Sequence, residues 1–515
     1  MIRYLYRPAM DVLEFADLAV IIAYLTLVVG VGLVVSRRSK APEDLLLAGR
    51  SMSTTAVFLS LMATELSAAT FIGVPQNSYS TASWAFLQFG LGALLAKLVL
   101  ARSLVPLYHN LGVSTVYGLI DLRFGALSRR CTALAFIAGR ILASGVRLFI
   151  AAIAVQTVTS LSLESAVLIC AVIAGMYSLV GGIRSVMVTD SIQGCVFIIA
   201  AISILWVVFE QIPGGLTSFM DWMQTNDSGK ILFWPESGTG DRGFLSILLA
   251  DSRSLPTALV GGFFLTMATH GTDHDMVQRL LTCGDGKSAG RALVISGLAN
   301  LPLTALFLVI GSAIACCWAL VPPSYGTGDG DKVLPLFILH EMPSGLLGLV
   351  LAGLLAAAMS SLDSAICAIS ATWTVDVLQR PISERTSTLR RTSFVVTLVL
   401  ALSAMSFSWL KNAGWAPADN LVELALSAMT IIYGALLGVF LCAGFTPSRG
   451  SSRSVIAALI TGSTLGAMLF LQKPLLGVED PLIAWPWWIV ITAPVTLGIC
   501  WIEKNPVAFE KRGDR

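Results

Sequence analysis

Carboxylates and hydroxyls lie inside three apolar stretches of this 515-residue chain. Asp190 follows Thr189 at the start of an apolar run that continues to Trp206, and Glu65 and Asp363 lie in two others. An ionisable side chain in such a run is expensive to bury, so each of the three is a candidate functional residue. Oxygen atoms in these places suit a hard cation such as Na⁺, so ion binding is the first chemistry that they indicate.

The stretch from Ala63 to Pro75 is unusual for a membrane helix. It contains one acid, three hydroxyls, a glycine and a proline. Unwound backbone is tolerated at membrane depth only where it lines a cavity or is buried in protein. We expect a broken helix here, with freed carbonyls that can bind Na⁺ and a half-helix N-terminus that can hold an anion. The alternative is a proline kink whose hydroxyls bond to the backbone.

A second cluster of hydroxyls follows an apolar stretch near residue 360. Ser360, Asp363 and Ser364 have the spacing i, i+3 and i+4, so they share one helix face, and Ser361 lies beside them. Such a group offers the oxygens that a desolvated Na⁺ requires. Small-residue helix packing is the alternative, and the carboxylate of Asp363 argues against packing alone.

The composition indicates that these residues are held by membrane-spanning helices. The chain is 56% hydrophobic and only 12% charged, against about 25% charged residues in soluble domains. The class is an all-α polytopic membrane protein in contact with the lipid bilayer, and the net charge of +2 gives no indication of nucleic-acid binding. We expect about thirteen spans, at 13–36, 53–78, 82–107, 131–158, 161–179, 187–209, 256–277, 288–320, 343–378, 391–410, 419–443, 453–472 and 484–502.

The basic residues in the loops predict an orientation. Most Lys and Arg residues fall on one side of the thirteen predicted spans, and this side includes the C-terminal tail. Positively charged loops stay in the cytoplasm, which predicts an outside N-terminus and a cytoplasmic C-terminus in the plasma (inner) membrane. The first apolar run is long enough to span and has no cleavage site, so we expect it to remain as a helix.

Four blocks of the sequence resemble the sodium:solute symporter family, whose members include sodium/glucose, proline, sialic-acid and anion cotransporters. The blocks are Pro42–Arg50, Leu66–Gly73, the G-G-x6-V-T-D-x-x-Q pattern from Gly181 to Gln193, and Asp273–Arg279, which is close to D-Q-x-x-V-Q-R. The resemblance covers nearly the whole chain. It implies a LeuT-like fold in which two inverted five-helix repeats surround a site near the membrane midplane.

The resemblance also divides the chain. A peripheral first helix and a cytoplasmic loop would occupy 1–52, the first repeat 53–209, and an outside loop 210–255. The second repeat would occupy 256–443, and two peripheral helices with a tail 444–515. The implied mechanism is alternating access driven by the Na⁺ gradient, with Na⁺ as the coupling ion.

The resemblance places a main sodium site between the first and eighth core helices. Its ligands would be the carbonyls of Ala63, Leu66 and Ala357 and the hydroxyls of Ser360 and Ser361. In sialic-acid-like members a second site joins an aspartate, here Asp190, to serines of the eighth core helix. The corresponding positions are Asp363 and Ser364, so a carboxylate replaces one serine.

For the substrate, the resemblance indicates the first, second, third and sixth core helices. Ser67 and Thr70 match the spacing by which sialic-acid-like members hold a carboxylate. The other substrate candidates are Glu65, Gln88, Phe89, Arg147, Thr266 and Thr269. Arg140 and Arg147 share a face of their helix, and a buried guanidinium suits a carboxylate. Pairing of Arg147 with Glu65 or a backbone carbonyl is the alternative.

These observations predict Na⁺-coupled uptake of a small organic anion that bears a carboxylate, such as a sialic acid or a monocarboxylate, by a protein that acts as a monomer. The alternative within transport is a neutral solute, namely a sugar, polyol or amino acid. The best support for an enzyme is a possible metal site at His270 and His274 with Asp273 and Asp275. An enzyme is disfavoured, because most of this stretch belongs to the Asp273–Arg279 block that resembles the symporter family. A sensor is disfavoured because no signalling module follows the last span.

Overall fold

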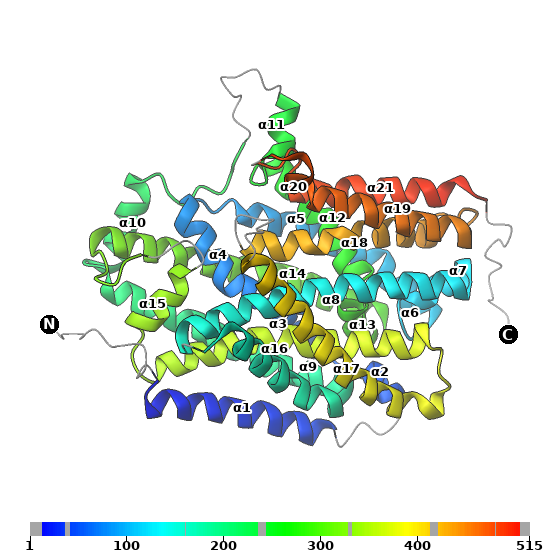
Figure 1. The fold of residues 1–515 in the computed structure, drawn as a ribbon, viewed down its shortest axis with the longest axis horizontal. Coiled ribbons are helices and arrows are strands. Elements are labelled where there is room, and N and C mark those ends of the chain that lie inside the picture. Colours follow the sequence, from blue (N-terminus) through cyan, green and yellow to red (C-terminus); the bar gives the residue numbers. More distant parts are fainter. Residues whose placement is uncertain are drawn as a thin grey trace.

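The computed structural model describes residues 13–36, 42–159, 161–234, 244–327, 332–412, 421–478 and 480–504. Within these ranges the regular elements are helices, and the only β-type pairings are isolated bridges such as Met52 with Cys283. The long helices run roughly side by side along the long axis of the molecule (Figure 1). The prediction of an all-α chain is therefore confirmed for the described residues.

The described chain up to Gln211 forms ten helical elements. They are α1 (Phe15–Ser36), α2 (Pro42–Leu47), η1 (Ala48–Arg50), α3 (Thr54–Glu65), α4 (Ala68–Thr81), α5 (Phe86–Arg102), α6 (Leu104–Leu111), α7 (Tyr117–Phe124), α8 (Ala126–Thr159) and α9 (Leu163–Gln211).

The C-terminal half continues with α10 (Gly215–Thr225), α11 (Phe244–Ala250), α12 (Leu255–Gly271), α13 (His274–Leu281), α14 (Gly286–Leu320), α15 (Val333–Glu341), α16 (Leu346–Thr372), the π-helical η3 (Trp373–Val377), α17 (Ile382–Asn412), α18 (Leu421–Phe445), α19 (Ser452–Phe470), α20 (Gln472–Leu476) and α21 (Trp485–Ile502).

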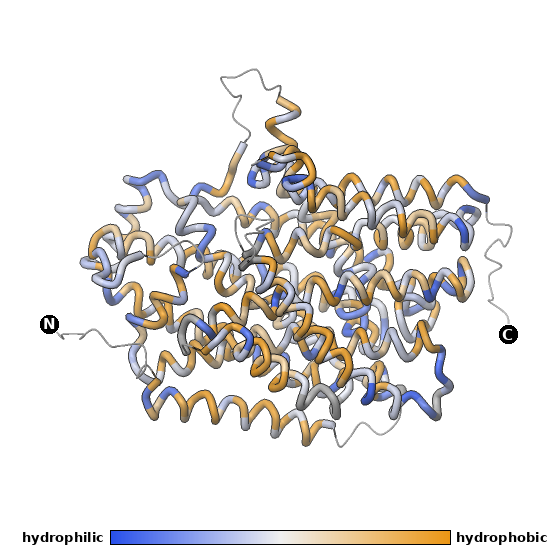
Figure 2. The backbone as a smooth tube through the Cα atoms, in the orientation of Figure 1, coloured by the Kyte–Doolittle hydropathy of each residue, from blue (hydrophilic) through white to orange (hydrophobic). Residues whose placement is uncertain are grey.

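The described helices make this a multi-pass membrane protein. Ten of them are long and apolar enough to cross a membrane, or eleven when the bent pair α3–α4 counts as one span. Apolar residues dominate the outer helices α1 and α21, and hydrophilic residues gather towards the helix ends (Figure 2). The expected spans 161–179 and 256–277 correspond to shorter helical stretches, Leu163–Gly175 and α12, so the count of thirteen stays a prediction.

The predicted broken helix is confirmed. Helices α3 and α4 are bent by 58° at their junction. Leu66 and Ser67 leave the helical conformation there, with ψ angles of 102° and 170°. The break lies between the two turns that carry Glu65 and Thr70, whereas Pro75 lies inside α4. A similar break separates α12 from α13, where Asp273 caps the second helix by accepting a hydrogen bond from the Asp275 backbone N–H.

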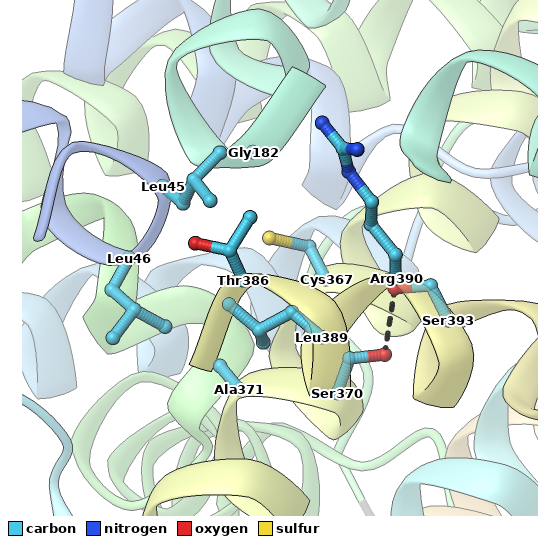
Figure 3. A pocket seen from close by; sticks show the side chains of 10 residues that line it. All are labelled: Leu45, Leu46, Gly182, Cys367, Ser370, Ala371, Thr386, Leu389, Arg390 and Ser393. Atoms are coloured by element: carbon cyan, nitrogen blue, oxygen red, sulfur yellow. Dashed lines mark hydrogen bonds between the residues drawn. The ribbon is translucent and has the colours of Figure 1, made fainter. Parts of the chain in front are cut away.

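Helix α9 is one kinked element where the sequence predicts two spans. Gly182 forms the kink with a φ of 59°, a conformation that favours glycine. A Cβ at this position would lie 2.8 Å from the Leu45 Cα. Figure 3 shows Gly182 and Leu45 facing each other beside a cavity of about 30 Å³, with the hydrogen bond from Ser393 to Ser370 (3.0 Å) at its edge. The glycine therefore lets α2 pack directly against α9.

The broken helices lie in the middle of the bundle. Helix α16 packs along α9 and also contacts α3 and α13, while α14 packs against α3, α4 and α5. Helix α12 packs on α5, and α18, α19 and α21 pack together on the side away from α1 (Figure 1). The unwound ends of α3 and α12 are thus enclosed by continuous helices, as buried irregular backbone requires.

Candidate functional site

Oxygen atoms of α3 and α16 meet beside the break. The Ser360 hydroxyl donates to the carbonyls of Ala63 (3.2 Å) and Ala357 (3.3 Å). The hydroxyl of Ser361 is buried and makes no hydrogen bond to any described residue. Leu66, at the C-terminal end of α3, is also buried. A buried hydroxyl without a partner is unusual, and carbonyl and hydroxyl oxygens are the ligands that a hard cation prefers. The residues present therefore fit a sodium ion.

A guanidinium lies between Asp190 and Ser364. Arg279 donates from Nη2 to Asp190 Oδ2 (3.0 Å) and to the Ser364 hydroxyl, and from Nε to the Ser60 hydroxyl (2.9 Å). Ser60 itself donates to Asp190 (2.6 Å). Asp190 is fully buried, and its Oδ1 makes no hydrogen bond among the described residues. Two of the three predicted ligands of the second sodium site, Asp190 and Ser364, are thus bridged by the positive charge of Arg279. The third, Asp363, accepts a hydrogen bond from the Ser364 backbone N–H (2.5 Å).

The same guanidinium begins a chain of buried ion pairs. Arg279 donates from Nη1 to Asp275 Oδ1 (2.6 Å), and Asp275 also accepts from Arg140. Arg140 donates in addition to Asp273 Oδ2 (3.0 Å), and the Tyr433 hydroxyl donates to the same oxygen (2.5 Å). Breaking one buried ion pair leaves an uncompensated charge, so the chain holds α8, α9, α13 and α18 in one arrangement.

A cavity of about 140 Å³ lies beside this chain of ion pairs. Six of the predicted substrate residues line it: Glu65, Thr70, Phe89, Arg147, Thr266 and Thr269. They come from both sides of the α3–α4 break and from α5, α8 and α12. The structure thus brings these six side chains to one cavity.

One end of the cavity is a hydrogen-bonded cluster around Glu65. Lys97 donates to both carboxylate oxygens, at 2.7 Å and 2.6 Å. His270 Nε2 lies 3.1 Å from Glu65 Oε1, and the Ser296 hydroxyl donates to the same oxygen (3.2 Å). His270 Nδ1 lies 2.9 Å from the Thr269 hydroxyl. Glu65 is therefore neutralised by Lys97 and does not pair with Arg147.

Arg147 lies in the wall of the cavity without a carboxylate contact among the described residues. Its Nη2 lies 3.6 Å from the Met429 sulfur, and its Nη1 is buried without a hydrogen-bond partner. Arg140, seven residues earlier on α8, by contrast forms ion pairs with Asp273 and Asp275, although its Nε has no hydrogen-bond partner among the described residues. Arg147 is thus a guanidinium in the cavity wall that lacks a carboxylate partner among the described residues.

Two predicted substrate residues lie outside the cavity lining. Gln88 is fully buried and donates to the carbonyls of Ala85 (3.2 Å) and Arg253 (3.0 Å), so it anchors the segment before α12. Ser67 is buried at the start of α4. Conversely, Lys97, Asn300 and Thr304 line the cavity although sequence reasoning did not select them. The signal for Lys97 was a lone charge inside an apolar run.

The metal-site alternative finds no geometric support in the described part of the chain. No group of three or more His, Cys, Asp or Glu side chains is placed there to hold a metal ion. His270 ends α12 and contacts Glu65, whereas His274 lies beyond the helix break on α13.

Comparison with known families decides the class of the protein. The model of the sodium:solute symporter family matches residues 45–462. The chain belongs to the sodium:solute symporter family. Na⁺ is accordingly the coupling ion, and the protein is a transporter rather than an enzyme.

The names of individual relatives agree with this family assignment. It is 27% identical to the sodium/sialic acid symporter NanT of Aliivibrio fischeri, over 81% of each chain. It is 26% identical to the sodium/sialic acid symporter SiaT of Proteus mirabilis, over 87% of this chain and 88% of that one. It is also 26% identical to the human sodium-coupled monocarboxylate transporter 1, over 81% of this chain and 66% of that protein.

The solved structures confirm the fold of the symporter. A Na⁺-coupled sialic acid symporter in a substrate-bound outward-open state superposes with a TM-score of 0.81 at 22% identity, covering 96% of this chain and all of that one. Mhp1, a nucleobase-cation-symport-1 family transporter, gives a TM-score of 0.53 at 14% identity, covering 90% of this chain and 94% of that one. The predicted LeuT-like fold is therefore confirmed.

Proposed function

We propose that this symporter takes up a small organic anion whose carboxylate binds Arg147. The observation that carries the proposal is the unpaired guanidinium in the cavity wall. A buried arginine is stable only when its charge is compensated, and a carboxylate matches its planar fork with two parallel hydrogen bonds. Thr70, from the start of α4, lines the same cavity and supplies a hydroxyl at a half-helix N-terminus. The names of the sialic acid and monocarboxylate relatives support an anionic substrate.

The coupling ion would bind at the Ser360–Ser361 cluster. Ala63, Leu66 and Ala357 would provide carbonyls, and Ser360 and Ser361 hydroxyls, around the unpartnered Ser361 oxygen. Ala63 lies only two residues before Glu65, which lines the cavity. Binding of Na⁺ at Ala63 would therefore fix the end of α3 and one end of the cavity together, which links the two sites.

A second sodium ion at Asp190, Asp363 and Ser364 would require a different position of Arg279. Its guanidinium already contacts both Asp190 and Ser364. We therefore propose that transport uses the Ser360–Ser361 cluster, and that Arg279 supplies the positive charge at the second location.

The proposed topology keeps the orientation given by the loop charges. The N-terminus would lie outside and the C-terminus in the cytoplasm of the inner membrane, with the symporter working as a monomer. The two inverted repeats would span 53–209 and 256–443, with the peripheral segments 1–52, 210–255 and 444–515 around them.

The test is ligand binding by the purified symporter in NaCl and in choline chloride. We expect thermal stabilisation by small carboxylates in NaCl only, because Na⁺ and substrate binding are linked. Arg147→Met should abolish this stabilisation, whereas the exposed lipid-side variant Gly30→Ala should retain it. Stabilisation of the wild type by sugars or polyols, but by no carboxylate, would overturn the anion proposal and favour the neutral-solute alternative.

A further inference from the structure

The cavity that contains Arg147 is also lined by a charge-neutral cluster of side chains around Glu65. Glu65 and Lys97 form an ion pair, and His270, Ser296 and Thr269 complete the hydrogen bonds. Lys97 is 1% exposed, whereas Glu65 and His270 are each 9% exposed. The lysine is therefore the least exposed of these three side chains, although all three line the cavity.

Glu65 retains hydrogen-bonding capacity on one oxygen. Its Oε1 accepts from Lys97, His270 and Ser296, but among the described residues its Oε2 accepts from Lys97 alone. A carboxylate oxygen has two lone-pair directions, so Oε2 has room for one more donor. Glu65 lines the cavity, so a ligand bound there can supply that donor.

The charge beside Glu65 selects the kind of donor. Lys97 compensates the carboxylate with two short contacts, so an ammonium group of a ligand would bring a second positive charge to an already neutral pair. A hydroxyl donates a hydrogen bond without adding charge. The cluster therefore favours a neutral donor, and it disfavours the α-ammonium of an amino acid.

The cavity volume favours a small ligand. Its 140 Å³ is close to the roughly 150 Å³ of an engineered protein cavity that accepts benzene, a molecule of six carbon atoms. Phe86, Phe89, Leu265 and Met429 provide apolar parts of the wall beside the polar side chains. A compact ligand with a short carbon skeleton fits this arrangement.

We infer that Glu65, held by Lys97 and His270, is a hydroxyl-recognition subsite, and that the substrate is a short-chain hydroxy-monocarboxylate. The inference rests on the proposed binding of a carboxylate by Arg147. The carboxylate binds at Arg147, the hydroxyl donates to Glu65 Oε2, and the carbon skeleton lies between the aromatic walls. Thr266 and Thr269 line the cavity near the same cluster.

The experiment compares carboxylates that differ by a single group. Dissociation constants for propionate, 2-hydroxypropionate, 3-hydroxypropionate, alanine and N-acetylneuraminate are measured on the full-length symporter in NaCl by calorimetry. We expect one of the hydroxypropionates to bind about ten- to a hundredfold tighter than propionate, and tighter than alanine, because the hydroxyl fills an otherwise unused acceptor.

A double variant that keeps the net charge tests whether Glu65 and Lys97 recognise the hydroxyl. Glu65→Gln with Lys97→Met removes both charges together, which avoids leaving one buried charge unpaired. The ratio of propionate to hydroxypropionate dissociation constants should fall to within about threefold of unity in this variant. Ser370→Ala, which lies outside the cavity, should keep the ratio of the wild type.

The outcomes separate this inference from the proposed function. Equal binding of propionate and both hydroxypropionates by the wild type overturns the subsite while leaving the carboxylate proposal intact. Tighter binding of alanine overturns the neutral-donor argument, and equally tight binding of N-acetylneuraminate overturns the size limit. Failure of every carboxylate to bind overturns the proposed function itself, and the inference falls with it.

Discussion

At the scale of single residues, Ser361 can be tested directly as a sodium ligand or as a packing residue. Its buried hydroxyl has no hydrogen-bond partner in the part of the chain that the structure describes, so Ser361→Ala removes an oxygen without breaking a hydrogen bond seen there. We expect the Na⁺ concentration for half-maximal substrate binding to rise about tenfold, equivalent to the loss of roughly 1.5 kcal/mol from one contact to a charged group. A titration of binding against NaCl measures this shift.

The control for that titration lies on the same helix. Ser370→Ala also removes a hydroxyl from α16, but Ser370 pairs with Ser393 at the α16–α17 contact. It should leave the sodium dependence unchanged. A Ser361→Ala protein with the sodium dependence of the wild type would show that Ser361 is only a packing residue.

Arg279 is a second residue whose role can be measured directly. Arg279→Met leaves Asp190 and Asp275 without their shared guanidinium. We expect a loss of about 3–5 kcal/mol in stability, because a buried charge becomes unpaired. Adding Asp190→Asn should recover part of this loss, since it removes one of the stranded charges. Thermal unfolding of the single and double variants tests the coupling, and strictly additive effects would contradict it.

Sequence reasoning identified many of these residues but not their partners. Asp190, Glu65 and the two arginines of α8 were recognisable, because charges inside apolar runs are rare. The contacts of Asp190 with Arg279, and of Arg140 with Asp273, join residues 89 and 133 positions apart. Such pairings depend on how the helices are arranged. The sequence therefore leaves Glu65 as a possible partner of Arg147, whereas in the structure Glu65 pairs with Lys97.

At the scale of elements, glycines set the distance between helices. A Cβ on Gly311 of α14 would lie 2.0 Å from the Pro75 carbonyl oxygen of α4. Gly311→Ala must therefore push α4 away from α14, and we expect it to lower stability by about 1–3 kcal/mol. Gly30→Ala on α1 is the matched control, because nothing lies within 4 Å of its added Cβ. The melting temperature of Gly311→Ala should be lower than that of Gly30→Ala. Equal values would contradict the close approach of α4 and α14.

The break in the helix was predicted within the stretch from Ala63 to Pro75. The chain leaves the helix at Leu66 and Ser67, inside that stretch, and not at the proline. Proline inside a membrane helix is tolerated where neighbouring groups satisfy the freed carbonyl. Pro75 has no N–H to donate, which frees the carbonyl of Phe71 four residues earlier, yet α4 continues through this position. Whether a proline ends a helix is therefore decided by the folded chain around it.

At the scale of the whole molecule, the orientation in the membrane is open to a direct test. Helix α1 begins at one end of the bundle and α21 finishes at the other, as an odd number of crossings requires (Figure 1). We expect a fluorescent protein fused after the C-terminus to fluoresce, and a periplasmic phosphatase fused there to be inactive. The reverse pattern would place the C-terminus outside and contradict the charge-based orientation.

The fold class could be predicted from sequence because hydropathy and the family blocks report it throughout the chain. The cavity could be predicted only in outline. Its wall combines residues from α3, α4, α5, α8, α12, α13, α14 and α18, and each contributes few side chains. No periodicity within one helix reveals which side chains of the others it will meet, so Asn300 and Thr304 carried no signal of their own.

The chain of buried ion pairs has a consequence for biosynthesis. Helix α8 must enter the membrane with Arg140 and Arg147, each unfavourable by about 2.5–3.5 kcal/mol on insertion scales. The partner Asp273 is 133 residues further along, which corresponds to roughly 7–27 s of translation. Throughout that interval α8 is an unsatisfied helix that other factors in the membrane must shield. Substitutions at Asp273 should therefore reduce the amount of protein made, through quality control of newly inserted chains, before any defect in transport is measurable.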